Sequence, residues 1–365
     1  MSNRESEFSK VLNTGDVLVV AFGAMIGWGW VVSSGQWITS GGVLGTVLGF
    51  IIGGIMIYFV GLCYAELTTA MPKCGGEHVF SYKAFGSIGA YICTWSIILS
   101  YIGVVCYEAV SFPTILQYVF PKIARGYLYS VGGFDIYFTW LLIAIGMALL
   151  ILFLNIIGMK KAARFQKILT CVIAAVGIAL VAGAAYSGNV SNLQNQLLIG
   201  DTSGEIIQNI AKVAIMTPFF LFGFDVIPQA AEEINVPLKK LGKMMILSII
   251  MAVSFYVLVV LAVGYVMNAG QIKTSMSSAT GLVTADAMGV AFNNANMAKV
   301  LIIGGLCGIV TSWNSFLIGG SRALYSMSVS YMLPRKFAVL HKKSNTPVNS
   351  FLLIGALSAI TPIVV

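Results

Sequence analysis

Long apolar stretches recur along the chain and leave little polar sequence between them. Each is long enough to cross a hydrocarbon core of about 30 Å, which takes about 20 helical residues. Nine such stretches lie near residues 16–39, 43–65, 87–120, 136–157, 166–186, 206–229, 244–267, 298–320 and 349–365. Only 9% of the 365 residues are charged, whereas a water-soluble domain carries about 25%. We therefore predict an all-α membrane protein with a single transmembrane domain over residues 1–365. The third stretch is too long to stand upright, and Gly103 and Pro113 give it places to bend, so we expect a tilted or kinked helix.

The placement of basic residues predicts the orientation in the membrane. The chain has 21 Lys and Arg and a net charge of +8. With the N-terminus inside, the outer loops hold five of these residues, and the other sixteen, Arg4 among them, lie on the inner side. The outer five are Lys122, Arg125, Lys212, Lys273 and Lys299. This bias predicts a multi-pass protein of the cell membrane with a cytoplasmic N-terminus. The positive charge is spread over separate loops, so we expect the lipid bilayer and not nucleic acid as a partner.

The residues of common catalytic and metal sites are scarce. His78 and His341 are the only histidines, and the six cysteines form no CxxC pair. No HExxH, GxSxG or GxxxxGK[ST] motif occurs, and these motifs carry zinc, serine and ATP chemistry. We therefore expect no enzyme activity, no cofactor and no firm metal site.

Two of the apolar stretches are interrupted near their middle. The first contains Gly23, Gly27 and Gly29, and glycine destabilises a helix by about 1 kcal/mol relative to alanine. The sixth contains Pro218, Gly223 and Pro228, with Asp225 at mid-depth, as its letters IAKVAIMTPFFLFGFDVIPQAAEE show. We expect both helices to be broken. The alternative is a GxxxG packing face in the first stretch and ordinary proline kinks in the sixth.

The two interrupted stretches are five crossings apart, so the second would enter the membrane from the opposite face. Paired interrupted helices in matching positions of two inverted halves indicate the central site of a transporter. We therefore expect a first five-helix repeat over residues 1–190 and a second repeat over 200–365.

Four segments resemble one family, the amino acid, polyamine and organocation (APC) permeases. They are GAMIGWGW in the first stretch, the loop MPKCGGEHVFSYKAFG, FFLFGFDVIPQAAEEINVP in the sixth stretch, and SRALYSMSVSYMLPRKFAVLHKKSNTP after the eighth. The resemblance implies a LeuT-like inverted-repeat fold of five plus five helices, with discontinuous helices 1 and 6. The second repeat has only helices 6–9 here, which predicts a chain truncated after the ninth helix. The alternative is a natural variant with nine spans.

The resemblance also implies where a substrate binds. The free N–H groups at Trp28 and Gly29, after the break at Gly27, would receive a carboxylate. The substrate ammonium would meet carbonyl groups at Met25, Phe219 and Phe222. We expect the side-chain pocket and an aromatic gate to come from a further set of residues, which are Tyr107, Phe224, Ser312, Asn314 and, for the gate, Phe219. The family commonly has serine where Trp28 stands, so we expect the ring of Trp28 to narrow the pocket.

The coupling ion has two candidates. Many prokaryotic members carry a lysine on helix five, and the matching position here is Ile173, which disfavours lysine-based proton coupling. Sodium would instead be held by the hydroxyls of Thr311 and Ser312 with carbonyls near Gly23 and Ile26, since a hard cation prefers oxygen ligands. The alternative is that both hydroxyls bond back to their own helix.

Two acidic residues are candidates for coupling or gating, and two more lie near the inner surface. Glu108 lies in an apolar run, where an ionisable group is costly and therefore a functional candidate. It would carry a proton or face a cationic substrate, unless it lies near the outer water layer or pairs structurally. Asp225 is typical of the family and would shape the sixth-helix break. Glu232 and Glu233 are expected to be solvated or to pair with Lys239 or Lys240.

Taken together, the residues and the resemblance predict a secondary amino acid transporter that works by alternating access, as a symporter or exchanger. The expected partners are a small amino acid, the bilayer, and a proton or sodium. The alternative is a permease for an amine such as ethanolamine or a polyamine. A channel is a further rival, which would conduct without saturation or counterflow.

Overall fold

The computed structural model describes residues 8–278 and 280–364. Arg4 and Val365 therefore lie outside the described residues. Within the described part, helices dominate and their bounds are α1 Thr14–Met25, α2 Gly29–Val32, α3 Ser34–Ala70, α4 Glu77–Val119, α5 Phe138–Ile156, α6 Met159–Ser187, α7 Ser203–Phe220, α8 Val226–Gln229, α9 Leu238–Val266, α10 Ala269–Met276, α11 Val283–Ala291, α12 Ala295–Val329 and α13 Val348–Val364. Short 3-10 turns span Pro121–Ile123, Val190–Leu193, Ala231–Glu233 and Arg335–Ala338.

Six of the described helices are long and apolar enough to cross a membrane, namely α3, α4, α5, α6, α9 and α12. They match the second, third, fourth, fifth, seventh and eighth predicted stretches. The first stretch is divided over α1, α2 and the beginning of α3, the sixth over α7 and α8, and the ninth is α13. The chain is therefore a multi-pass membrane protein. The relation of residues 1–190 and 200–365 as inverted repeats stays a prediction.

The bends in the long helices fall at other residues than expected. Gly86 leaves the helical conformation with φ +73° inside α4, which separates the first residues of the helix from the span that follows. Gly103 and Pro113 remain within the helix. Gly42 interrupts α3 in the same way, and a side-chain carbon there would lie 2.5 Å from the carbonyl oxygen of Leu197. The helix is therefore kinked as expected, but the residue with non-helical angles is Gly86, where a positive φ is required and glycine adopts it readily.

Both helix breaks predicted from the sequence are present. Helix α1 ends at Met25, Ile26 has the non-helical angles φ −106° and ψ 76°, and α2 begins at Gly29. Helix α7 ends at Phe220, and α8 begins only at Val226. Gly223 between them has φ +131°, a backbone conformation that side chains disfavour.

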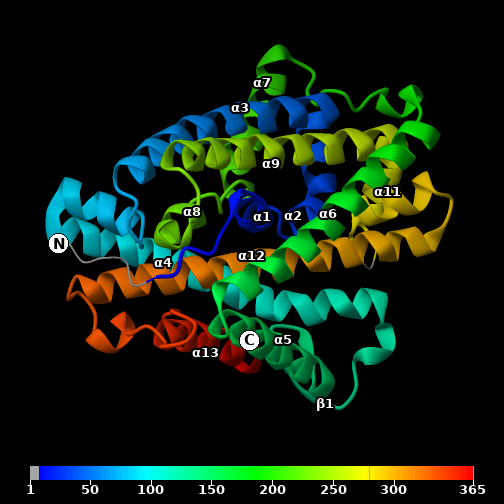
Figure 1. Ribbon diagram of the computed structural model, residues 1–365. Coiled ribbons are helices and arrows are strands. Elements are labelled where there is room, and N and C mark those ends of the chain that lie inside the picture. The colour runs from blue at the N-terminus through cyan, green and yellow to red at the C-terminus, as the bar shows by residue number, and fades with distance from the viewer. Residues whose placement is uncertain (1–7, 279, 365) are drawn as a thin grey trace.

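Helix α12 runs through the middle of the bundle and carries a nearly continuous series of buried residues from Leu301 to Ser328. Figure 1 shows α3 and α9 side by side on one flank of it, and α4, α5 and α13 on the other. Helix α1 lies between these groups and packs against α6, α9 and α12. The break in the first span is therefore enclosed by helices on several sides.

A two-stranded hairpin departs from the all-helical expectation. Strands β1 (Tyr127–Val131) and β2 (Phe134–Tyr137) pair antiparallel between α4 and α5, with Val131 opposite Phe134. The turn residues Gly132 and Gly133 both have positive φ, as a tight two-residue hairpin requires.

The N-terminal segment is hydrogen-bonded to the residues that follow α8. The N–H groups of Val11 and Leu12 donate to the carbonyl of Glu233 at 2.9 and 3.0 Å, and Leu12 and Ile234 form a parallel bridge. The Glu233 carboxylate pairs with Arg322 of α12 at 2.7 Å, and both side chains are buried. The expected pairing of Glu233 with Lys239 or Lys240 is therefore wrong, because Glu233 turns inward toward α12.

Candidate functional site

The break in the first span leaves peptide groups without helical partners. The N–H groups of Gly27, Trp28 and Gly29 donate no hydrogen bond to any acceptor among the described residues. The Met25 carbonyl accepts from the hydroxyl of Tyr256 at 2.9 Å. The start of α2 therefore offers donors at the positive end of a helical segment, where an anion is stabilised.

The break in the sixth span is folded around Asp225. Its Oδ1 accepts from the N–H of Gly223 at 2.9 Å, and its Oδ2 accepts from the hydroxyl of Tyr101 on α4. The carboxylate is buried and its two acceptors are both used within the protein. This arrangement fits the predicted role of Asp225 in shaping the break.

The two breaks meet each other. A side-chain carbon added to Gly223 would lie 2.8 Å from the carbonyl carbon of Ala24 in α1. One added to Gly29 would lie 2.7 Å from the ring of Phe220, at the end of α7. The exposed peptide groups of both spans therefore belong to one region of the bundle.

A buried carboxylate borders this region. A side-chain carbon at Gly27 would lie 3.4 Å from the Ser312 hydroxyl and 3.5 Å from Oε1 of Glu108. The Ser312 hydroxyl donates to that Oε1, whereas Oε2 of Glu108 is buried without any partner. Since a buried carboxylate oxygen without a donor is costly, Glu108 stays the candidate for binding a proton or a cationic group.

Comparison with known proteins identifies this arrangement. The Amino acid permease family matches residues 16–364. The chain belongs to the amino acid permease family. Among its curated relatives, the branched-chain amino acid permease BcaP of Bacillus subtilis is 26% identical over 98% of this chain and 75% of the relative. The methylthioribose transporter of the same bacterium is 23% identical with the same coverage.

More distant comparisons agree on the type of protein. The vacuolar cationic amino acid transporter 8 of Arabidopsis thaliana is 25% identical over 98% of this chain and 59% of the relative. A sodium-coupled sialic acid symporter, solved with substrate in an outward-open state, aligns with a TM-score of 0.66. It is 12% identical and covers 97% of this permease and 75% of the symporter. The likeness supports the transporter fold, and the family and relatives make this protein a membrane transporter, not an enzyme.

In this permease the four residues of the expected sodium site do lie close together. A side-chain carbon on Gly23 would lie 3.1 Å from Cβ of Thr311, and one on Gly308 would lie 2.8 Å from the Ile26 carbonyl oxygen. The Thr311 hydroxyl donates to the Gly308 carbonyl at 2.9 Å and so bonds back to α12. The one hydroxyl proton of Ser312 has two acceptors within reach, Oε1 of Glu108 and the Ile309 carbonyl of its own helix.

Sequence reasoning missed the residues of α6 that face Gly23. A side-chain carbon on Gly23 would lie 2.5 Å from Nε2 of Gln166 and 3.2 Å from the Thr170 hydroxyl. That hydroxyl is buried and has no partner. Ile173, the expected match to the family's lysine, is buried within the apolar core. Which residue of α6 faces α1 depends on the rotation of α6 about its axis, and counting residues from a sequence motif does not determine that rotation.

Asn314 belongs to a buried amide network and not to an open pocket. Its Nδ2 donates to Oε1 of Gln166 at 2.8 Å, and its Oδ1 accepts from Asn155 of α5 at 2.7 Å. Gln166 in turn donates to Ser315 at 2.9 Å. The network joins α5, α6 and α12, so both polar atoms of Asn314 are engaged in contacts between helices.

Several aromatic residues expected in the pocket lie elsewhere. Tyr107 is 60% exposed and Phe219 is 79% exposed, so both point out of the bundle. Adjacent helical residues differ by 100° in direction, which is why Glu108 faces inward and Tyr107 does not. Phe224 packs its ring on Tyr64 at 5.4 Å.

Other aromatic residues occupy the inward positions. Phe220, one residue after Phe219, contacts Trp37 and Tyr256, with ring centroids 4.7 and 6.1 Å away. It is therefore the aromatic group next to the first break, in place of Phe219. Phe222 stacks on Phe316 at 5.3 Å.

Trp28 does not narrow the region between the breaks. Its indole is buried against α12, where a side-chain carbon on Gly305 would lie 2.3 Å from the ring. The ring fills the notch that this glycine leaves in α12. The expected narrowing by Trp28 is therefore not observed, and its backbone N–H stays unpaired.

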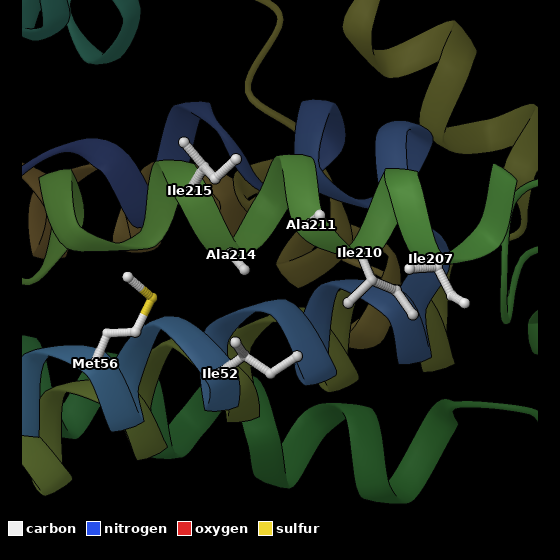
Figure 2. A pocket seen from close by; sticks show the side chains of 7 residues that line it. All are labelled: Ile52, Met56, Ile207, Ile210, Ala211, Ala214 and Ile215. Atoms are coloured by element: carbon white, nitrogen blue, oxygen red, sulfur yellow. The ribbon is translucent and has the colours of Figure 1, made fainter. Parts of the chain in front are cut away.

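A cavity of about 320 Å³ lies apart from the breaks, between α3 and α7. Figure 2 shows its lining, which is entirely apolar: Ile52, Met56, Ile207, Ile210, Ala211, Ala214 and Ile215. None of these residues supplies a polar group, so this cavity does not fit a zwitterion.

Gly308→Ala is expected to lower substrate affinity by about tenfold. Its new methyl group would lie 2.6 Å from the Gly27 carbonyl oxygen, and such overpacking costs about 1–3 kcal/mol. The measurement is the Kd of purified protein for its best substrate. Gly103→Ala is the matched control, since a side-chain carbon there meets nothing within 4 Å. Equal Kd values for both variants and the wild type would show that α12 does not support the break.

Proposed function

We propose that this permease carries zwitterionic amino acids across the cell membrane by alternating access. One observation carries the proposal: two broken helices meet at Ala24 and Gly223, beside a buried carboxylate with one unpaired oxygen. Substrates bind between such half-helices in membrane transporters because the unwound backbone supplies polar groups where lipid supplies none.

The two charged ends of an amino acid match the two kinds of free group. The substrate carboxylate accepts hydrogen bonds from the N–H groups of Gly27, Trp28 and Gly29. The ammonium meets the carbonyls at the end of α7, and Glu108 supplies the negative charge nearest to Gly27. An amine without a carboxylate would leave the α2 donors unpaired, so the amine alternative is not favoured, in agreement with the amino acid permeases among the relatives.

We propose that α1 and the α7–α8 pair move against a scaffold that includes α4 and α12. The unpaired N–H groups lie on the moving side, and Glu108 and Ser312 lie on the scaffold side. Binding of one substrate to both sides would couple occupancy to closure. The N-terminus then lies in the cytoplasm, and residues 1–190 and 200–365 correspond to the two inverted repeats.

Counterflow tests this function. Vesicles that contain the protein are loaded with one unlabelled amino acid and mixed with a panel of labelled amino acids and amines. We expect saturable, stereoselective accumulation of one class of amino acid and no accumulation of ethanolamine or polyamines. Accumulation of amines alone, or conductance without counterflow, would contradict the proposal.

Sodium is the coupling ion that we favour. Carbonyls at Gly23 and Ile26, the hydroxyls of Thr311 and Ser312, and the unpaired hydroxyl of Thr170 are all uncharged oxygen groups, which suit a hard cation. The sodium-coupled structural neighbour agrees with this choice.

Replacing sodium with potassium is expected to reduce uptake at least about tenfold. Potassium would not make the contacts that sodium makes in its site, so more than about 1.4 kcal/mol of coupling free energy between ion and substrate binding would be lost. The measurement is initial uptake into vesicles at constant ionic strength. Thr311→Val, which keeps the side-chain shape, should lose the sodium stimulation. Equal uptake in sodium and potassium would contradict sodium coupling and leave the proton as the ion.

A further inference from the structure

A loop on the N-terminal side of the membrane is docked onto the half-helix that follows the sixth-span break. The N–H of Gly75 donates to the carbonyl of Gln229 in α8 at 3.1 Å. A side-chain carbon on Gly76 would lie 2.7 Å from Pro228, also in α8. Movement of α8 therefore requires this loop to move with it or to release it.

The side chains at this junction have an incomplete set of hydrogen bonds. Nε2 of Gln229 donates to Oε2 of Glu77, the first residue of α4. Oε1 of Glu77 and Oε1 of Gln229 are both buried and have no partner. Glu77 is 4% exposed and Gln229 is 0% exposed, so water does not reach these two oxygens in this state.

Among the residues that the structure describes, no cation forms an ion pair with Glu77. Arg322 is the buried cation of this end of the bundle, and its guanidinium is held bidentately by Glu233. The Tyr64 hydroxyl lies within hydrogen-bonding reach of the Glu77 carboxyl group, and the Asp225 carboxylate is close enough to repel a charge there. A second carboxylate nearby makes an ionised Glu77 still more costly.

The remaining polar groups around Glu77 are already committed. His78 directs Nδ1 to Thr94 and Nε2 to Ser330, both at 2.9 Å. Tyr101 donates to Asp225. Lys73 in the loop is exposed.

We propose that Glu77 binds a proton in this state and forms a cyclic pair with Gln229 that latches the loop onto α8. Gln229 donates from Nε2 to Oε2, and protonated Oε1 of Glu77 donates to Oε1 of Gln229. A single proton thereby satisfies both unpaired oxygens and removes the buried charge. Release of this proton leaves an uncompensated carboxylate, and the loop separates from α8. The latched state holds one proton more than the open state, so rising pH favours opening.

The latch rests on the proposed transport function for its purpose, since it would control when the α8 half-helix opens toward the N-terminal side. Its test does not use transport. Failure of the latch and failure of the transport proposal are therefore separate results.

Cys74 reports directly on the latch because it is buried in the same loop, 6% exposed. Burial raises the pKa of its thiol well above the usual range, so its alkylation requires the loop to lift. The experiment measures maleimide labelling of Cys74 by peptide mass spectrometry in the purified full chain without substrate. Alkylation of free cysteine in the same buffer serves as the standard for the intrinsic pH dependence of the reagent.

The wild type is compared with Glu77→Gln, which keeps a neutral amide pair at every pH. We expect equal Cys74 labelling of the two proteins at about pH 5. The ratio of wild type to variant should then rise toward about pH 8, by at most about tenfold per pH unit for one proton. Equal labelling at low pH also shows that the variant folds as the wild type does.

Two further variants complete the test. Glu66→Gln, an exposed change at the nearby end of α3, should follow the wild type. Gln229→Leu removes the partner, so Cys74 should label rapidly and show only the pH dependence of a free thiol. Parallel pH profiles of the wild type and Glu77→Gln, or a flat profile in Glu66→Gln, would overturn the proposal.

Discussion

Glu108→Gln is expected to weaken amino acid binding by roughly 10- to 100-fold. The change keeps the shape of the side chain and leaves an oxygen to accept from Ser312. It removes the negative charge beside Gly27 and replaces the unpaired oxygen Oε2 with an amide donor. A hydrogen bond to a charged group contributes about 1.5–3 kcal/mol, which corresponds to this range of affinity. The measurement is the Kd of the purified protein for the substrate found by counterflow.

The same variant separates the two roles of Glu108. If the residue carries the coupling proton, the pH profile of uptake becomes flat in Glu108→Gln. If it only faces the ammonium group, affinity falls and the pH profile keeps its shape. Glu66→Gln is the control for removal of an exposed carboxylate. Unchanged affinity together with an unchanged pH profile would remove Glu108 from the site.

Arg322→Ala is expected to destabilise the protein by about 3–5 kcal/mol, because it leaves Glu233 as an uncompensated buried charge. Arg322 is completely buried and donates to both carboxylate oxygens of Glu233, at 2.7 and 3.1 Å. It also donates to Ser321 and lies over the ring of Phe351 at 4.9 Å. The measurement is thermal unfolding of the purified protein in detergent.

Removal of both charges distinguishes a lost ion pair from lost packing. The double variant Arg322→Met with Glu233→Gln should recover most of the stability, because the buried charge is gone and the volume is largely kept. Arg335→Ala, an exposed change, should leave the unfolding temperature nearly unchanged. A double variant as unstable as Arg322→Ala would show that packing, and not charge compensation, dominates at this position.

The breaks and the general site could be predicted from local sequence. Clustered glycines at 23, 27 and 29, and Pro218 with Gly223, disfavour a continuous helix through intrinsic backbone preferences. These preferences act within a few residues, so the breaks appear where the sequence places them. Glu108 stood out because it is a charge in an apolar run, and it lies beside Gly27 in the structure.

The partners across the bundle could not be predicted in the same way. Whether Tyr107 or Glu108 faces inward depends on the rotation of α4, and a long apolar helix has little polarity difference between its faces to fix that rotation. The same limit applies to Phe219 and Phe220, and to Ile173 and Thr170. Gln166 could have been noticed as a polar residue at the start of an apolar helix. Its contact with Gly23, however, depends on tertiary packing.

The buried polar groups on the N-terminal side show a second limit. Glu77 and Glu233 lie in polar connections of the sequence, where solvated carboxylates are the usual outcome. The structure buries both because the loop and the N-terminal segment fold over α8. Burial of a connecting segment is a property of the assembled bundle and leaves no pattern in the local sequence.

In the proposed mechanism, the peptide groups of two broken helices hold both charged ends of one substrate. Calorimetry tests this by comparing the preferred amino acid with the amine that lacks its carboxylate and with the acid that lacks its ammonium. We expect each single-charge analogue to bind at least about tenfold more weakly, because one set of charged hydrogen bonds is lost. Binding of the amine or the acid as tight as that of the amino acid would refute the mechanism.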